Sequence, residues 1–385
     1  MGKNKKNVYS QSITYKELHK IYKEEDIFDI YVIKIYYVNH NPEKDERRQQ
    51  HYELTRVELT AGDISTSLYK KLNKVIKPIN DAIRNNKFCY SSSNMGKTIS
   101  WQIFYLLKEI ISYCECNYYR GQSDNYTLNP GILRKSINEE YLNRFEDEYL
   151  ELSRTYPNQL SYYKPQKFLE RESALSLLQH YGFKTSLLDI TSDPYIAMLF
   201  MMSNSINLYK EPTLYLFDVD IINNKKYNLF TKVKKSSFNE RISAQHGAFF
   251  NFDKLLLSGP YCQNSKNNKF SRIKTIKLQL CFDDSIFDKL FNDKVQSIYK
   301  SNDSFSIQQV PLFNILGNNY REKQDIDKIK LETLKKIQRD LLSKLNEFCY
   351  YMEDLFPDFE KQLQFLIDKY PDKKTDDQLN YHLNI

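Results

Sequence analysis

One segment constrains the fold more than any other: a short apolar run that leads through a polar turn into a helix. The run spans residues 187–190 and has the length and apolar character of a buried strand. Asp193 then offers a side-chain N-cap, and Pro194 suits the first position of a helix. The apolar residues behind it repeat at helical spacing, at Ile196, Leu199 and Phe200. The segment therefore predicts a strand, a turn and a helix in immediate succession, within an α+β protein.

Polar side chains collect where this strand ends. Asp189, Thr191 and Ser192 stand beside the expected helix N-terminus, a common place to hold an anionic or hydroxylated ligand. The alternative is that these side chains only satisfy backbone donors in the turn. His180, in the preceding run Gln-His-Tyr-Gly, belongs to a residue type that more often serves the core or a turn than catalysis.

A second block joins aromatic residues to an arginine and a glycine. Residues 118–122 read Tyr-Tyr-Arg-Gly-Gln, and residues 128–134 read Leu-Asn-Pro-Gly-Ile-Leu-Arg. Arg120, at the end of an aromatic strand, would place a fixed cation beside Gly121, whose backbone a ligand can approach closely. An ion pair between Arg120 and a structural carboxylate is the alternative.

The remaining pattern mixes helices and strands. Helices are expected over residues 15–22, 68–83, 98–113 and about 331–348, and strands over residues 27–38, 213–219 and 276–282. The serine-containing residues 85–94 are the best linker candidate. We therefore expect an N-terminal domain of unknown role over residues 1–95, and a second domain over residues 96–385 with a helical C-terminal extension.

Composition narrows the class of protein. Lys and Arg total 56 against 49 Asp and Glu, and the net charge of +7 permits a polyanionic partner without requiring one. No apolar run approaches the roughly 18 residues that a membrane helix needs. The six cysteines form no regular framework, and the first residues lack a signal-peptide pattern, so we expect a cytoplasmic protein with free thiols and no membrane partner. No second Cys or His pair accompanies Cys114 and Cys116 at zinc spacing, so we expect no metal site.

Three common catalytic motifs are absent from the sequence. Gly96-Lys97-Thr98 resembles the end of a phosphate-binding P-loop, but Ser91 stands where that loop needs a glycine. There is no Gly-x-Ser-x-Gly elbow and no His-Glu-x-x-His motif. Their absence argues against the commonest serine hydrolases and the commonest helical zinc hydrolases.

Taken together, the blocks resemble the FRG domain, a bacterial family named after its aromatic-Arg-Gly motif. The first two motifs are Tyr-Arg-Gly-Gln at 119–122, with Arg134 downstream, and Gln-His-Tyr-Gly at 179–182, with the segment 185–194 behind it. The last two are Arg-Ile-Ser-Ala-Gln-His-Gly-Ala-Phe at 241–249 and Leu-Phe-Pro-Asp-Phe at 355–359. The resemblance runs from about residue 98 to the C-terminus.

A more distant resemblance connects the same residues to ADP-ribosyltransferases of the Arg-Ser-Glu type. It implies a split β-sheet cleft with surrounding helices, in which the strand arginine grips the ribose and phosphates of NAD. The third motif of that superfamily ends in a glutamate, whereas this chain has Gln245-His246-Gly247. Glu240, five residues before Gln245, is the nearest substitute carboxylate.

The two resemblances imply a set of site residues. Catalytic roles fall to Arg120, Ser192, Gln245 and Glu240. NAD, as the substrate, is expected to contact Tyr119, Gly121, Gln122, Arg134, His180, Tyr181, Asp189 and Thr191. Arg120, Asp189 and Ser192 are expected to line one concave pocket.

The function implied is that of a bacterial effector that binds NAD and transfers ADP-ribose or releases nicotinamide, as a toxin or in antiphage defence. The acceptor, whether protein or nucleic acid, is left open. One alternative is a non-catalytic module that recognises a nucleotide or a modified end. Another is a protein that acts on nucleic acid, for which the positive charge and the interleaved Tyr and Lys residues are the support.

Overall fold

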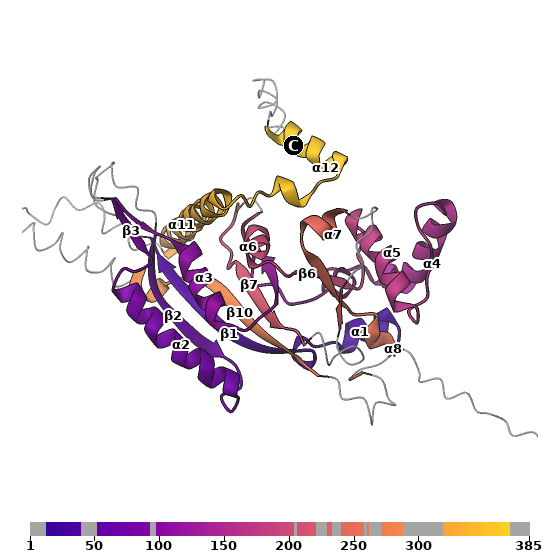
Figure 1. Cartoon of the computed structure of the whole chain (residues 1–385), viewed down its shortest axis with the longest axis horizontal. Coiled ribbons are helices and arrows are strands. Elements are labelled where there is room, and N and C mark those ends of the chain that lie inside the picture. The colour runs from indigo at the N-terminus through magenta and orange to yellow at the C-terminus, as the bar shows by residue number, and fades with distance from the viewer. Residues whose placement is uncertain are drawn as a thin grey trace, which may run out of the picture.

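The computed structural model describes residues 13–39, 52–92, 98–203, 206–220, 229–232, 240–257, 260–261, 271–287 and 319–369. Its centre is a mixed sheet of eight strands with helices packed against it (Figure 1). The prediction of an α+β protein is therefore confirmed. Within the described ranges, no helix has both the length and the apolar character to cross a membrane.

The helices and strands follow one another in mixed order along the chain. The strands are β1 (Phe28–Val38), β2 (Glu53–Ala61), β3 (Cys89–Ser92), β4 (Thr98–Trp101), β5 (Tyr118–Gln122), β6 (Leu187–Thr191), β7 (Thr213–Asp218), β8 (Phe230–Thr231), β9 (Gly247–Asn251) and β10 (Ile273–Phe282). The helices are α1 (Tyr15–Ile21), α2 (Ser67–Arg84), α3 (Ile103–Tyr113), α4 (Glu139–Thr155), α5 (Phe168–His180), α6 (Pro194–Met202), α7 (Glu240–Ala244), α8 (Lys254–Leu257), α11 (Asn319–Glu347) and α12 (Phe359–Lys369). Short 3₁₀ turns cover Glu24–Asp26, Gly131–Leu133 and Glu353–Leu355.

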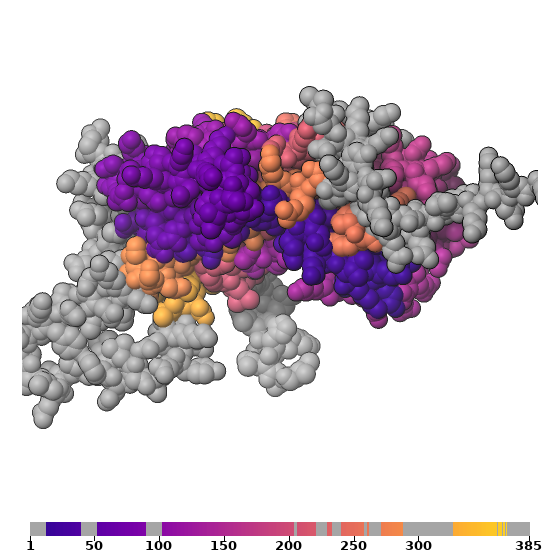
Figure 2. All heavy atoms as spheres, turned by 90° about the horizontal axis from the view of Figure 1, so that it is seen from below, coloured from indigo at the N-terminus to yellow at the C-terminus, as the bar shows by residue number. Residues whose placement is uncertain are grey.

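The large sheet has the strand order β2-β1-β10-β7-β5-β6-β9-β8, while β3 and β4 form a separate hairpin. All neighbours in the large sheet are antiparallel except β1 and β10, which run parallel from the pair Phe28 and Ile273 to the pair Tyr37 and Phe282. On one face of the molecule, indigo N-terminal residues lie beside orange residues from the later part of the chain (Figure 2), in agreement with the pairing of β1 with β10. Strands from before residue 95 thus share a sheet with strands from after it, and the domain boundary at that point stays a prediction.

Two hydrophobic cores lie on opposite faces of the sheet. Neighbouring residues of a strand point to opposite faces, and Tyr118 packs into one core while Tyr119 packs into the other. Helices α2, α3, α6 and α11 supply the core that contains Tyr119, and helices α1, α4, α5 and α8 supply the core that contains Tyr118. Each fully buried large apolar side chain stabilises the folded state by roughly 1.5–3 kcal/mol. The two cores therefore fix the position of the sheet that lies between them.

Most of the predicted elements are present at the expected positions. The strand and helix around Asp193 are β6 and α6, and the Asp193 carboxylate accepts a hydrogen bond from the backbone N–H of Tyr195 at 2.8 Å as an N-cap. The prediction of one helix over residues 98–113 is wrong in its first turn. Residues 98–101 pair with β3 as strand β4, and helix α3 begins only at Ile103. The β-branched and aromatic residues of this stretch suit a strand, and antiparallel pairing with the preceding strand β3 decides between the two forms.

Gly121 is required by packing between a strand and a helix. Helix α6 crosses strand β5 so closely that a Cβ atom on Gly121 would lie 1.8 Å from the carbonyl oxygen of Ala197 and 2.5 Å from the backbone nitrogen of Met201. Both neighbours are backbone atoms, so neither can move without shifting the helix. The glycine of the aromatic-Arg-Gly motif therefore lets α6 approach the sheet, in addition to bordering the site described below.

Replacing Gly121 by alanine is expected to lower the free energy of unfolding by about 3 kcal/mol, because the added methyl group overpacks a backbone contact. Gly247→Ala is the matched control. A Cβ atom there would meet its nearest neighbour at 3.4 Å, an ordinary contact, and should change stability little. Chemical denaturation of both variants gives the comparison, and equal stability of the two would contradict the packing role of Gly121.

Candidate functional site

A cavity of about 1060 Å³ opens at the junction of strands β5 and β6. Its volume is slightly above the usual range for pockets that hold small molecules, roughly 300–1,000 Å³. Its walls come from both strands, from helices α5, α6 and α7, and from the C-terminal segment.

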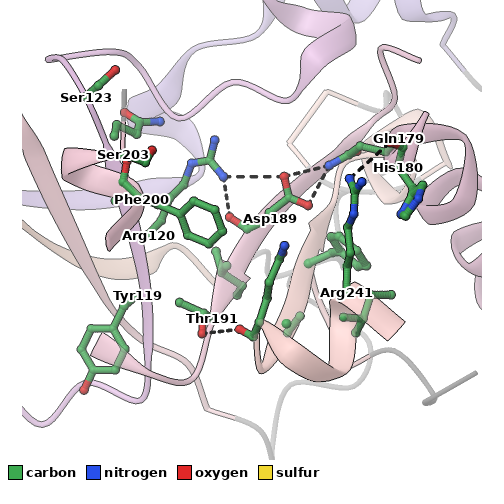
Figure 3. Close-up of a pocket in the computed structure, with 18 of the residues that line it drawn as sticks. Tyr119, Arg120, Ser123, Gln179, His180, Asp189, Thr191, Phe200, Ser203 and Arg241 are labelled. Carbon is green, nitrogen blue, oxygen red and sulfur yellow. Dashed lines mark hydrogen bonds and ion pairs between the residues drawn. The ribbon is translucent and has the colours of Figure 1, made fainter. Parts of the chain in front are cut away.

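The cavity lies where the sheet divides. Strand β5 pairs with β7 at five positions, and β6 pairs with β9 at five, but β5 and β6 pair with each other only at Tyr119 and Thr191. Beyond that pair the two strands separate. Arg120 of β5 and Asp189 of β6 face one another across the gap (Figure 3).

Arg120 spans the gap with its guanidinium. Its Nη1 donates a hydrogen bond to the backbone carbonyl oxygen of Asp189 at 2.6 Å and lies 3.9 Å from the carboxylate of the same residue. The Gln122 amide, in the orientation that satisfies both of its groups, accepts a hydrogen bond from Arg120 Nε at 3.1 Å. The side chain is only 15% exposed, so the cation is held in a fixed place. Among the described residues no protein acceptor engages Nη2, which leaves a donor for a ligand.

Asp189 is held from the other side by Gln179. The Gln179 amide nitrogen donates to both carboxylate oxygens, at 2.7 and 2.8 Å, and Thr185 fixes the amide by donating to its oxygen. The Asp189 side chain lines the cavity and is 56% exposed. Burial raises the pKa of Asp189, and the charges of Arg120 and Arg134 act against that shift.

The electrostatic balance of the lining favours an anion. Asp189 is the one carboxylate among the described lining residues, whereas the lining cations are Arg120, Arg134, Lys135, Arg241 and Lys361. A cavity with an excess of positive charge concentrates anionic ligands, and it does so most strongly at low salt.

Most, but not all, of the predicted site residues line the cavity. Those that do are Tyr119, Arg120, Gly121, Gln122, Arg134, His180, Asp189, Thr191 and Gln245. Tyr181, Ser192 and Glu240 do not line it. Tyr181 is 73% exposed beyond the end of α5, Glu240 is exposed at the start of α7, and Ser192 is bonded through its backbone N–H to the carbonyl of His246. The expectation that Arg120, Asp189 and Ser192 share a pocket thus holds for the first two.

Three of the lining residues serve the architecture of the site. The Tyr119 side chain points away from the cavity, and its hydroxyl donates to the carbonyl of Cys116 at 2.8 Å (Figure 3). Thr191 donates to the backbone carbonyl of Gln245 at 2.7 Å. The Gln245 amide in turn donates to the carbonyl of Leu355 at 3.0 Å. Gln245 thereby ties the C-terminal segment to the sheet.

The sequence did not reveal the strongest of these ties. Arg241 and Asp358 form a two-point ion pair, with Nε 2.6 Å from Oδ2 and Nη2 3.0 Å from Oδ1. Hydrogen bonding to Arg241 lowers the pKa of Asp358 to about 2. The Arg241 guanidinium also lies 5.0 Å from the ring centre of Phe356. The two residues belong to the third and fourth motifs of the sequence, so these motifs hold each other.

Comparison with models of known protein families gives a match to part of this chain. The family model of the FRG domain matches residues 115–209. The chain contains an FRG domain. No curated protein and no solved structure matches the chain.

The FRG match includes β5 with Arg120, α5 with Gln179 and β6 with Asp189, and it also includes Arg134, which follows the 3₁₀ turn Gly131–Leu133. The residues that close the cavity from the other side, Arg241, Gln245 and the segment around Phe356, lie outside the matched range. Gln179 belongs to a motif that the sequence singled out, but its role in orienting Asp189 is visible only in the structure. Among the described residues, no group of His, Cys, Asp and Glu side chains is arranged to hold a metal ion.

The Arg241–Asp358 pair is expected to stabilise the docked C-terminal segment. In a double-mutant cycle of Arg241→Gln and Asp358→Asn, we expect a coupling free energy of about 1 kcal/mol, since the pair is two-pointed and mostly shielded from solvent. The exposed pair Arg144 and Glu148 on α4 is the matched control, with an expected coupling of about 0.3 kcal/mol. Chemical denaturation measures both cycles. Coupling at Arg241 and Asp358 no larger than in the control would contradict the docking role.

Proposed function

We propose that the FRG domain binds NAD, or a closely related nucleotide, in the cavity between β5 and β6. The observation that carries the proposal is Arg120, a fixed cation that spans the divided sheet and has a donor left for a ligand. Phosphate oxygens are the natural partners of a guanidinium. The volume of the cavity and the further cations Arg134 and Lys135 suit a ligand that carries more than one phosphate.

The chemical step proposed is cleavage of the bond between nicotinamide and ribose. The bonding electron pair leaves with nicotinamide, and the ribose carbon becomes positively charged until water or an acceptor adds to it. Such a state needs positioning and a nearby anion more than a strong nucleophile. Asp189 is the described carboxylate that lines the cavity, and Gln179 orients it, so we assign the stabilising role to Asp189 in preference to Glu240.

This assignment follows the resemblance to ADP-ribosyltransferases, in which a strand arginine and a split sheet form the NAD site. With NAD as the substrate, transfer of ADP-ribose to protein or nucleic acid, or release of nicotinamide to water, would suit a bacterial toxin or an antiphage effector. The second candidate is a non-catalytic module that recognises a nucleotide or a modified end. It is favoured by the positions of Ser192 and Glu240 outside the cavity and by the engagement of Gln245 in a structural hydrogen bond.

NAD is expected to raise the melting temperature of the protein, because a ligand at a hundredfold excess over its dissociation constant stabilises the native state by roughly 2.7 kcal/mol. Arg120→Gln should abolish this shift. Arg154→Gln, which changes an exposed arginine on α4 away from the cavity, should keep it. Differential scanning calorimetry with and without NAD tests both. A shift that survives in Arg120→Gln would contradict the proposed site.

Catalysis and recognition are separated by nicotinamide release. If the domain is an enzyme, Asp189→Asn should lower the release rate by about a hundredfold or more with little change in NAD affinity, as expected for a group that acts mainly in the transition state. Glu240→Gln should behave like the wild type, because Glu240 is exposed outside the cavity. Binding of NAD by the wild type without any release would support the recognition module and overturn the enzymatic step.

A further inference from the structure

The C-terminal segment contributes an apolar wall to the cavity, opposite the wall that carries Arg120 and Asp189. Met352, Phe356 and Phe365 line the cavity from this segment, and Phe200 lines it from α6. The ring centres of Phe356 and Phe200 lie 6.3 Å apart at a right angle, and those of Phe356 and Phe365 lie 6.1 Å apart. These spacings are those of an aromatic cluster. Phe200 and Arg120 both line the cavity (Figure 3).

This wall is fixed in place by polar contacts on both sides of it. Arg241 stacks over Phe356 and pairs with Asp358, and Gln245 binds the carbonyl of Leu355. Tyr350, just before the wall, donates to the Asp193 carboxylate at 3.0 Å. The segment is therefore tied to the turn after β6 and to α7, and its rings keep a set position relative to Arg120.

Helix α12 has one face toward the cavity and another toward solvent. Lys361 and Phe365, one helical turn apart, both line the cavity. Phe359, Leu363 and Ile367 follow the same spacing on another face and are exposed, Phe359 to 83%. One helix thus offers a phenylalanine inside the cavity and a phenylalanine outside it, at positions six residues apart.

We propose that the wall formed by Phe200, Met352, Phe356 and Phe365, here called the aromatic wall, binds the adenine base of the nucleotide. Phe365 is the ring on which the adenine stacks, while the phosphates lie at Arg120. The inference rests on the proposed function and deepens it, since it assigns the choice of a base-containing ligand to residues outside the matched FRG range. A planar base gains from stacking on an aromatic face whatever its hydrogen-bonding groups. Lys361, on the same face of α12, adds a cation beside the ring.

The test compares two ligands on matched variants. NAD carries bases and phosphates, whereas inorganic pyrophosphate carries phosphates alone. Phe365→Ala is expected to weaken NAD binding about tenfold or more and to leave pyrophosphate binding unchanged, since it removes a ring and no charge. Phe359→Ala, on the exposed face of the same helix, should leave both affinities unchanged. Phe365→Leu keeps an apolar side chain of similar volume for packing and should also weaken NAD. Isothermal titration calorimetry gives all of these affinities.

Each outcome decides the proposal. Selective loss of NAD affinity in both Phe365 variants supports the aromatic wall. Unchanged NAD affinity, or equal loss of NAD and pyrophosphate, overturns it. Wild-type protein that binds pyrophosphate but not NAD also overturns it while leaving a phosphate site at Arg120. Wild-type protein that binds neither ligand refutes the proposed function itself, and the aromatic wall with it.

Discussion

The site depends on one hydrogen bond across a divided sheet, from the Arg120 guanidinium to the backbone carbonyl of Asp189. Strands β5 and β6 pair at a single position, so the backbone alone does not hold the two halves of the sheet together at this point. Arg120 bridges them with a charge-assisted hydrogen bond of 2.6 Å. The same guanidinium is the cation that an anionic ligand would meet. The residue that joins the two halves is thus also the residue at the centre of the proposed ligand site.

Packing on either side keeps this arrangement open and fixed. Gly121 lets α6 lie directly against β5, so the strand that carries Arg120 cannot shift toward the helix. On the other side of the cavity, Arg241, Gln245 and Asp358 anchor the C-terminal segment as a wall. Gln245 lies where the expected ADP-ribosyltransferase pattern would have a glutamate, and in this structure its side chain holds the C-terminal segment by a hydrogen bond to the carbonyl of Leu355. A reaction at this site would therefore rely on Asp189 for negative charge.

The sequence predicted the parts of the fold that are decided locally. The N-cap at Asp193, the proline behind it and the apolar run of β6 all act within a few residues, and each is present as expected. Contacts between distant residues could not be predicted in this way. The parallel pairing of β1 with β10 joins residues more than two hundred positions apart, and no local pattern specifies it. The pairing of Arg241 with Asp358 also joins residues more than a hundred positions apart, and either residue alone would be interpreted as a solvated charge. Gly121 stands out in the sequence as part of the aromatic-Arg-Gly motif. The reason for a glycine there, the backbone of α6 packed against β5, is seen only in the structure.

If Arg120 and the aromatic wall hold two parts of one nucleotide, a crystal structure of the protein with bound ADP-ribose will show both contacts. We expect pyrophosphate oxygens within hydrogen-bond reach of the Arg120 guanidinium, at about 2.7–3.2 Å, with the adenine ring stacked on Phe365. ADP-ribose bound elsewhere on the protein, with the space between β5, β6 and α12 empty, would contradict this placement.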